Sequence, residues 1–300
     1  MIKHLMVLID ETHPEFKILK ERSKNEFINL YVYNKDKADF LYYSVLDKTW
    51  ESFEEVQKYY NGVYATDPRY LIGKKIQIPY FYNVSGDFTD FREFNIYYSQ
   101  LSGASAVFVN DRTLNKFSCW SGLNSYLLNP SIGGYNYSQR KFFTPKLHIG
   151  YIYDGDDSTF EVIKKVISLN KANWVFHLYV GDKCVGGDNV ILYDGENFEE
   201  KLFENVHVLI GFNDRALRSL SSGVVPISNL SNFSNILFDK THYFKLDFCE
   251  ANCLIDILRY CDKRREKLER MSELGRKEFD KYFNVENIVK QKYDAILEVL

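Results

Sequence analysis

The second half of the chain alternates short apolar runs with amphipathic stretches, and this alternation restricts the fold more than any other feature of the sequence. Apolar runs at 147–153, 174–180 and 206–210 are each followed by residues with turn signals or helical spacing. Strands that alternate with helices in this way form a parallel sheet joined by right-handed crossovers. The pattern therefore predicts an α/β fold with a doubly wound parallel sheet over residues 146–300.

The first half also contains apolar runs, at 4–9, 27–33, 75–84 and 104–109. Residues 131–145 contain paired glycines and a closing proline with little apolar periodicity, which is typical of a linker. A chain of 300 residues is long enough for two lobes of roughly 150 residues each. We therefore expect two Rossmann-like lobes, residues 1–140 and 141–282, and a terminal helix over 283–300.

Local signals predict the bounds of several helices. Residues 50–60 have helical spacing and stop at an Asn-Gly pair, and 90–101 also read as a helix. Ser158 is the expected N-cap of a helix that ends at Leu169. The charged residues from Ile255 to Tyr282 predict one long helix.

Composition excludes several classes of protein. A net charge of −3 and a pI near 6.1 give no electrostatic reason to expect a nucleic-acid partner. No segment reaches the ~18 apolar residues of a membrane span, and the N-terminal apolar run is too short for a signal peptide. The five cysteines have no metal-ligand spacing and predict reduced, mostly buried thiols. Together these features predict a cytoplasmic location.

Motifs in the same order as the alternating pattern resemble the group 1 glycosyltransferases, a retaining family of GT-B fold. The resemblance covers most of residues 75–300 and is strongest after 146. In the second half it rests on the opening strand 146–152, the segment 173–182, the Gly211-Phe212 turn and the stretch 221–227. Weaker matches in the first half and at the C-terminus are 78–88, 102–110, 127–130 and 283–286.

This resemblance implies two lobes facing across a cleft, with residues 1–140 on the acceptor side and 141–282 as the nucleotide-sugar lobe. It also implies that the terminal helix over 283–300 crosses back to the first lobe. The implied reaction moves a sugar from a nucleotide donor to a glycan, lipid-linked or protein acceptor with retention. The family requires no metal or other cofactor beyond the nucleotide-sugar co-substrate. A lipid-linked acceptor would involve peripheral membrane contact through aromatic side chains. The second partner implied is another transferase or a further copy of this chain.

The chain departs from the family at its pair of carboxylates, which bracket the helix after the Gly-Phe turn with seven residues between them. The two positions are occupied here by Ile210 and Arg218. We therefore expect groups other than these carboxylates to make the donor and phosphate contacts in the second half. The candidates are Gly150, Asp154, Gly211, Phe212, Arg215 and Arg218.

Three functions remain open on the sequence. In the first, the enzyme is active and the guanidinium groups of Arg215 and Arg218 bind the diphosphate. In the second, the chain is a catalytically inactive homologue that serves as a binding or partner subunit. In the third, Asp154 and Asp156 form an Asp-x-Asp motif that holds a divalent metal, and the transferase is metal-dependent.

The catalytic residues are not identified by a motif. Asp87 and His13 are candidates because each follows an expected strand, and open α/β sheets bind ligands beyond strand ends. His13 could bind the acceptor or the transferred sugar, although a surface histidine is the commoner case.

Overall fold

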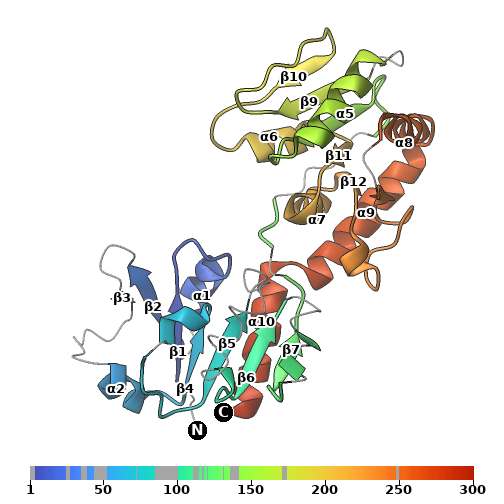
Figure 1. The fold of residues 1–300 in the computed structure, drawn as a ribbon. Helices are drawn as coiled ribbons and strands as arrows, with labels where there is room; N and C mark the ends of the chain where they lie inside the picture. Colours follow the sequence, from blue (N-terminus) through green and yellow to red (C-terminus); the bar gives the residue numbers. More distant parts are fainter. Residues whose placement is uncertain are drawn as a thin grey trace. The chain divides into compact units, whose positions relative to one another are not determined.

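The computed structural model describes residues 4–24, 28–34, 39–43, 53–71, 73–84, 101–110, 115–116, 118–119, 121–130, 132–135, 142–170, 174–247 and 250–300. The chain divides into two compact units (Figure 1). Unit 1 comprises Met1–Ser131 together with Phe283–Leu300, and unit 2 comprises Ile132–Tyr282. The division falls about ten residues before the boundary at 140 that the linker composition predicts, and the C-terminal helix belongs to unit 1.

Unit 1 is built on a sheet of order β3-β2-β1-β4-β5-β6-β7, in which only β3 runs antiparallel to its neighbour among the described strands. The central strand β1 is buried along its whole length, as expected for a parallel strand covered on both faces. Its strands are β1 Leu5–Ile9, β2 Ile28–Asn34, β3 Asp39–Tyr43, β4 Gly62–Ala65, β5 Tyr80–Val84, β6 Ala106–Val109 and β7 Ser125–Leu127. The helices are α1 Phe16–Arg22, α2 Phe53–Val56, the short η1 Gln57–Tyr59 and η2 Pro68–Leu71, and α10 Val285–Val299.

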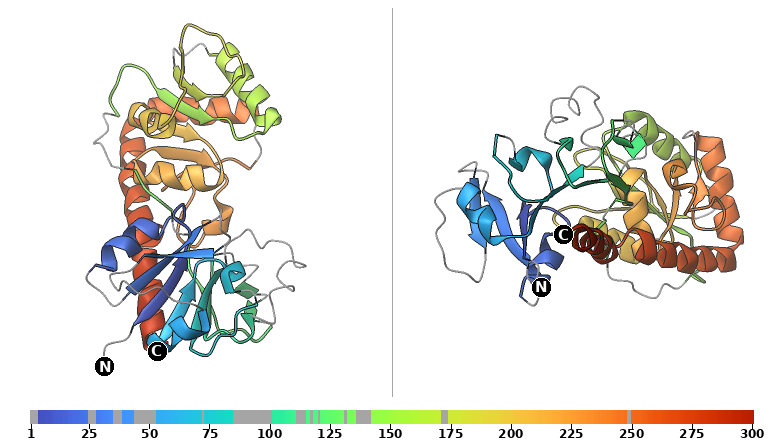
Figure 2. Two further views of the ribbon diagram at one scale, coloured as in Figure 1. Left: turned by 90° about the vertical axis from the view of Figure 1, so that its left-hand side faces the viewer. Right: turned by 90° about the horizontal axis from the view of Figure 1, so that it is seen from below.

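The C-terminal helix α10 is part of the core of unit 1, although more than 100 residues separate it from the rest of that unit. Val289, Tyr293 and Ile296 of α10 pack with Val7 and Ile9 of β1. In Figure 2 the helix, drawn in red, runs along the sheet. Burial of these apolar side chains stabilises the helix in this position.

A buried ion pair also joins α10 to unit 1. The Lys292 ammonium contacts the Glu15 carboxylate and donates to Asn83 Oδ1 at 2.8 Å. Tyr64 donates to the other Glu15 oxygen at 3.1 Å. Burial raises the pKa of Glu15, but Lys292 and the hydrogen bonds outweigh burial and hold this pKa below its usual range. The carboxylate is therefore charged, and its charge is compensated inside the unit.

Unit 2 contains an all-parallel sheet of order β10-β9-β8-β11-β12-β13. Side chains of α5, α8 and α9 pack on one face of the sheet, and those of α6 pack on the other. The strands are β8 His148–Ile152, β9 Val175–Tyr179, β10 Val190–Leu192, β11 Val208–Ile210, β12 Val225–Ser228 and β13 Phe244–Lys245. The helices are α5 Asp157–Ser168, α6 Phe198–Asn205, α7 Asn213–Ser221, the short η4 Ser231–Phe233, α8 Ala251–Lys263 and α9 Arg265–Tyr282.

The predicted α/β class with two doubly wound sheets is confirmed, with corrections to single elements. Asp156, and not Ser158, is the N-cap of α5. The long helix expected over 255–282 is two helices, because the backbone at Arg264 leaves the helical region. Strands β3, β4 and β13 had no clear signal in the sequence. The helix expected at 90–101 lies almost entirely outside the described residues.

Of the cysteines in the described ranges, Cys261 is buried, whereas Cys119, Cys184 and Cys253 are exposed. The expectation of mostly buried thiols was therefore wrong.

None of the helices in the described ranges is both long enough and apolar enough to cross a membrane.

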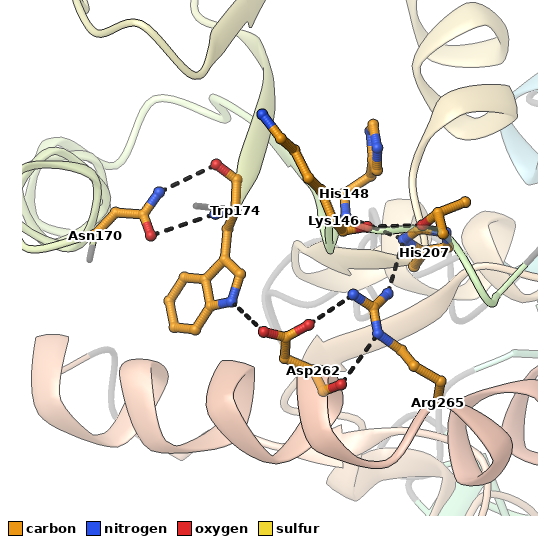
Figure 3. Close-up of polar contacts among 8 residues, drawn as sticks. Lys146, His148, Asn170, Trp174, His207, Asp262 and Arg265 are labelled. Atoms are coloured by element: carbon orange, nitrogen blue, oxygen red, sulfur yellow. Dashed lines mark hydrogen bonds and ion pairs between the residues drawn. The ribbon is translucent and has the colours of Figure 1, made fainter. Parts of the chain in front are cut away.

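The amino-terminal edge of the unit 2 sheet is closed by a hydrogen-bonded network at the junction of α8 and α9 (Figure 3). Asp262 accepts from the Trp174 indole at 3.0 Å and from Arg265 at 2.7 Å. The Arg265 guanidinium lies 3.3 Å from His207 Nδ1, and this nitrogen accepts from the His148 amide at 3.0 Å. Trp174, His148 and His207 stand at the starts of β9, β8 and β11, so the network ties three strands to the two helices.

A histidine chain continues from this network across β9. His148 Nδ1 lies 2.8 Å from His177 Nε2, and the other nitrogen of His177 lies 2.9 Å from the Tyr193 hydroxyl. Burial, with a smaller contribution from His148, lowers the pKa of His177 to about 4. His177 is therefore neutral in the folded protein near pH 7.

We expect replacement of Lys292 by Met to destabilise unit 1 by about 3–5 kcal/mol, because it leaves the Glu15 carboxylate buried without its counter-charge. Hydrogen exchange in β1 and β4 would measure this loss. The matched control is Lys290→Met, at an exposed position of the same helix, which should cost less than about 0.5 kcal/mol. Adding Glu15→Gln to Lys292→Met should recover part of the loss. Equal effects of the two lysine variants would contradict a role for the buried pair.

We also expect unit 2 to lose stability in acid. Since the folded-state pKa of His177 lies below the unfolded value of about 6.5, the unfolded chain takes up the proton first as the pH falls. Neutral His177 makes its full contribution to the free energy of unfolding above pH 6.5. As the pH falls to about 4, this free energy should decrease by roughly 2–3 kcal/mol. Urea unfolding followed by circular dichroism at several pH values would measure this slope. His177→Gln should flatten it, and an unchanged slope would contradict the assignment.

Candidate functional site

Each sheet has a point at which its strand order reverses. In unit 2 the chain moves outward from β8 to β9 and β10, and then returns to the other side of β8 with β11. In unit 1 the same reversal occurs between β1 and β4. The adjacent helices leave a crevice beyond the carboxyl ends of the two strands at such a point, and open α/β sheets bind ligands there. These two places are therefore the candidate ligand sites of the two units.

In unit 2 the turn after β11 leads directly into α7. Gly211 and Phe212 form this turn, and Phe212 is the N-cap of the helix. Its side chain cannot accept a hydrogen bond, so the N-cap residue provides no side-chain cap for the first amides of α7. Helix amides of this kind carry a partial positive charge that favours an anion. The two residues singled out from the sequence thus lie at the strand-order reversal.

Arg215 connects the two sides of this reversal. It lies in the first turn of α7, and its Nη1 donates to the carbonyl oxygen of Tyr153, just after β8, at 3.4 Å. Within the described parts of the chain no carboxylate forms an ion pair with it. Because a guanidinium has five N–H donors and this contact uses one, Arg215 can still bind an anion at the start of α7.

Arg218 has different surroundings, although it is only three residues further along α7. Its Nη1 donates to Glu199 Oε2 of α6 at 3.2 Å. The Glu199 side chain is only 13% exposed, and its second oxygen, Oε1, is buried with no hydrogen-bond partner. The structure therefore pairs Arg218 with a carboxylate of the neighbouring helix. Arg215 and Arg218, which the sequence presents as equivalent, therefore have different partners and do not form one site.

The acidic turn after β8 forms the start of α5. Asp156 Oδ1 accepts from the amide and the hydroxyl of Ser158 at 2.9 and 2.7 Å, and Oδ2 accepts from the Thr159 hydroxyl at 2.6 Å. The hydrogen bonds from Thr159 and Ser158 lower the pKa of Asp156 to about 2. Asp154 Oδ1 accepts from the Asp156 amide at 3.2 Å. Helix capping thus accounts for Asp156 without a metal.

No group of three or more His, Cys, Asp or Glu side chains that could hold a metal ion occurs within the residues that the structure describes. A metal role for Asp154 and Asp156 stays a prediction.

The two candidate glycines have different surroundings. Gly150 lies in the middle of β8 beneath α6, and a Cβ atom there would come within 2.8 Å of Leu202 and 3.2 Å of Val206. The absence of a side chain at Gly150 lets α6 pack closely on the sheet. Gly211 follows the last residue of β11 and lies at the reversal itself.

Lys183 is a residue of this edge that the sequence analysis missed. It follows β9 and forms an ion pair with Asp157, and its ammonium lies 4.6 Å from the centre of the Tyr153 ring. Tyr153 in turn donates to Asp157 at 2.9 Å. Its position just after Gly181-Asp182, at the end of an expected strand, is the sequence signal that could have identified it. Lys183 adds a second cation beside the turn that Arg215 contacts.

In unit 1 the structure places His13 at the corresponding reversal, in the loop after β1. Its Nδ1 accepts from the Glu15 amide at 3.3 Å, which leaves the proton on Nε2. Burial lowers the pKa of His13, and the carboxylates of Asp10 and Asp67 act in the opposite direction. Asp67 follows β4, so groups from both strand ends act on the imidazole. Asp87, the other catalytic candidate, lies outside the described residues.

Comparisons with known proteins find the fold but no close relative. No family model matches the chain, and no curated protein matches its sequence. Sucrose-phosphate synthase from Thermosynechococcus elongatus superimposes with a TM-score of 0.68 at 10% identity, over 99% of both chains. Anabaena HepE in complex with UDP-glucose gives 0.66 at 9% identity, over 98% of this chain and 99% of that one. A glycosyltransferase from Rickettsia africae gives 0.71 at 10% identity, over 99% and 98%. These likenesses confirm the GT-B fold class.

We expect Arg218→Gln to lower the stability of unit 2 by about 1–3 kcal/mol, because the mostly buried Glu199 loses its charged partner. Urea denaturation would measure the loss. The control is Arg259→Gln on α8, whose ion pair with Asp256 is exposed and should contribute less than about 0.5 kcal/mol. Glu199→Gln added to Arg218→Gln should restore part of the stability. A loss no larger than that of the control would show that the pair has no structural role.

Proposed function

We propose that this chain is a glycosyltransferase that moves a sugar from a nucleotide-sugar donor to an acceptor, and that unit 2 binds the donor. The observation that carries the proposal is the strand-order reversal in unit 2. There the uncapped start of α7 and the Arg215 guanidinium lie together beside the turn after β8. This combination suits a diphosphate, and the GT-B fold is consistent with it.

The chemistry follows from the charge that develops during transfer. When the bond between the sugar and the nucleotide breaks, negative charge builds on the departing diphosphate. Amides of α7 and the Arg215 guanidinium would stabilise that charge in the transition state, so the proposal needs no metal. We expect the sugar to be transferred with retention, as the resemblance to group 1 glycosyltransferases implies. The acceptor is a glycan, a lipid-linked sugar or a protein.

Unit 1 would then contribute the acceptor side of the reaction. His13 offers an imidazole N–H at the reversal in that unit, and Asp10 and Asp67 directly follow or lie just beyond the two strands there, β1 and β4. Sugar hydroxyls are both donors and acceptors of hydrogen bonds, so a mixed set of this kind can bind them. We propose His13 as a residue that contacts the acceptor or the transferred sugar.

One observation favours a second candidate, a chain that binds the donor without turnover. The positions of the family's two carboxylates hold Ile210, which is fully buried, and Arg218, which is paired with Glu199. Neither can supply the missing carboxylate. The inactive homologue would still bind the nucleotide, so binding and transfer must be measured separately.

The first experiment is isothermal titration with uridine, guanosine and cytidine diphosphates and their sugars, with either EDTA or manganese present. Uridine compounds are the first choice, because the HepE structure contains UDP-glucose. We expect one nucleotide to bind in EDTA. Dependence on manganese would favour the Asp-x-Asp alternative, and no binding by any donor would contradict the proposal. Release of the nucleotide from its sugar, with and without acceptors, then separates an active enzyme from the inactive homologue.

We expect Arg215→Gln to weaken nucleoside diphosphate binding about 10-fold or more, because a charge-assisted hydrogen bond contributes roughly 1.5–3 kcal/mol. The same titration measures this loss of affinity. Arg259→Gln removes an equal charge from α8 and should leave the affinity unchanged. If Arg215→Gln binds as tightly as the wild type, the diphosphate does not contact this residue.

A further inference from the structure

A cavity of unit 2 lies away from the strand-order reversal. It has a volume of about 530 Å³ and is formed by α9 and the loop that precedes β13, which lie side by side in Figure 1. Arg265, the first residue of α9, contacts His207 at the amino-terminal edge of the sheet. The cavity begins at the next residue of the helix, so it lies toward the amino-terminal edge rather than the carboxyl edge. Its lining residues are Lys240, Thr241, Glu266, Lys267, Arg270, Met271 and Leu274.

The loop that forms one wall is held in place by its own hydrogen bonds. The Phe238 amide donates to His242 Nδ1 at 2.9 Å, and the Lys245 amide donates to Asp239 Oδ1 at 2.8 Å. Lys240, between them, has a positive φ of 56°, a conformation that non-glycine residues rarely adopt. The loop therefore presents Lys240 and Thr241 in a defined and strained conformation.

A glycine of α9 lets this loop approach the helix. A Cβ atom at Gly275 would lie 3.3 Å from the carbonyl oxygen of His242 and 2.7 Å from a methyl carbon of Leu220. Any other residue would push the loop outward. The wall that carries Lys240 thus sits against α9 because position 275 has no side chain.

The charges in the cavity are mostly positive. Lys267 and Arg270 are three residues apart on α9 and share a face of the helix, and Lys240 faces them from the loop. These three cations and one acid, Glu266, give a net charge of 3 − 1 = +2. Within the described ranges, no carboxylate lies close enough to these cations to form an ion pair. A concave site with uncompensated positive charge of this size attracts a dianion.

We propose that this cavity binds a phosphomonoester. A guanidinium matches the geometry of phosphate oxygens, and ammonium groups and a hydroxyl can complete the set of donors. Met271 and Leu274 supply an apolar wall for the carbon skeleton that carries the phosphate. This site is separate from the diphosphate site proposed at the start of α7, and it does not depend on that assignment.

The phosphomonoester could belong to a soluble metabolite or to a lipid headgroup. Exposed aromatic side chains lie beside the cavity: Phe238 is 52% exposed, and Tyr260, whose ring lies 5.4 Å from the Lys267 ammonium, is 40% exposed. Aromatic and basic side chains together are typical of surfaces that contact anionic membranes. The chemistry of recognition is the same in both cases, so the experiment must distinguish the sources.

The test uses the full chain without nucleotide and two probes, glycerol 3-phosphate in isothermal titration and phosphatidic acid vesicles in sedimentation. We expect saturable binding of at least one probe, weakened about 10-fold in Arg270→Gln and in Lys267→Gln. The matched control is Lys277→Gln, an exposed lysine of α9 outside the cavity. It should bind like the wild type, and phosphatidylcholine vesicles should not bind.

Binding of the vesicles alone would identify a lipid headgroup as the source, and binding of glycerol 3-phosphate would identify a soluble one. The proposal is overturned if neither probe binds saturably. It is also overturned if Arg270→Gln and Lys267→Gln bind normally, or if Lys277→Gln weakens binding equally. Nucleotide titration of Arg270→Gln, expected to match the wild type, keeps this result distinct from the proposed donor site.

Discussion

Both sheets consist almost entirely of parallel strands, and parallel strands can follow one another only through a crossover that returns the chain to the starting edge. Every loop after one of the parallel strands therefore begins at the same edge of its sheet, the carboxyl edge. Where the strand order reverses, beside β1 and beside β8, two such loops diverge and leave room for a ligand. His13 and Arg215 occupy these places because of the connectivity, not because of any local motif. The rest of the proposed chemistry depends on this arrangement.

The two edges of the unit 2 sheet have different roles. At the amino edge, Asp262 and Arg265 bond to Trp174 and His207, so polar groups there are largely satisfied within the protein. A connected network of this kind makes the edge rigid. At the carboxyl edge, α7 begins without a side-chain cap. Its amides therefore suit an external anion, and the rigid opposite edge holds the strands that position them.

The candidate residues illustrate how far sequence reasoning reaches. Gly211, Phe212 and Arg215 were candidates because the Gly-Phe turn and the helix after it resemble those of the group 1 glycosyltransferases, and the structure places them at the reversal. Arg218 lies on the same helix and has the same side chain, but Glu199 of α6 pairs with it. That partner is nineteen positions away in the chain, and no spacing rule connects the two. Sequence could identify the helix but not the neighbour that each arginine meets.

The sequence by itself determined the α/β class and most strands of unit 2, because burial on two faces and helical spacing leave a periodic record in the chain. The GT-B fold came from the resemblance of its motifs to the group 1 glycosyltransferases. The resemblance implied that the terminal helix returns to the first lobe, but only the tertiary structure decided that Lys292 of this helix pairs with Glu15, 277 positions away. It also decided that a basic cavity forms beside Gly275. These outcomes depend on contacts between distant segments, and such contacts leave no local pattern in a single sequence.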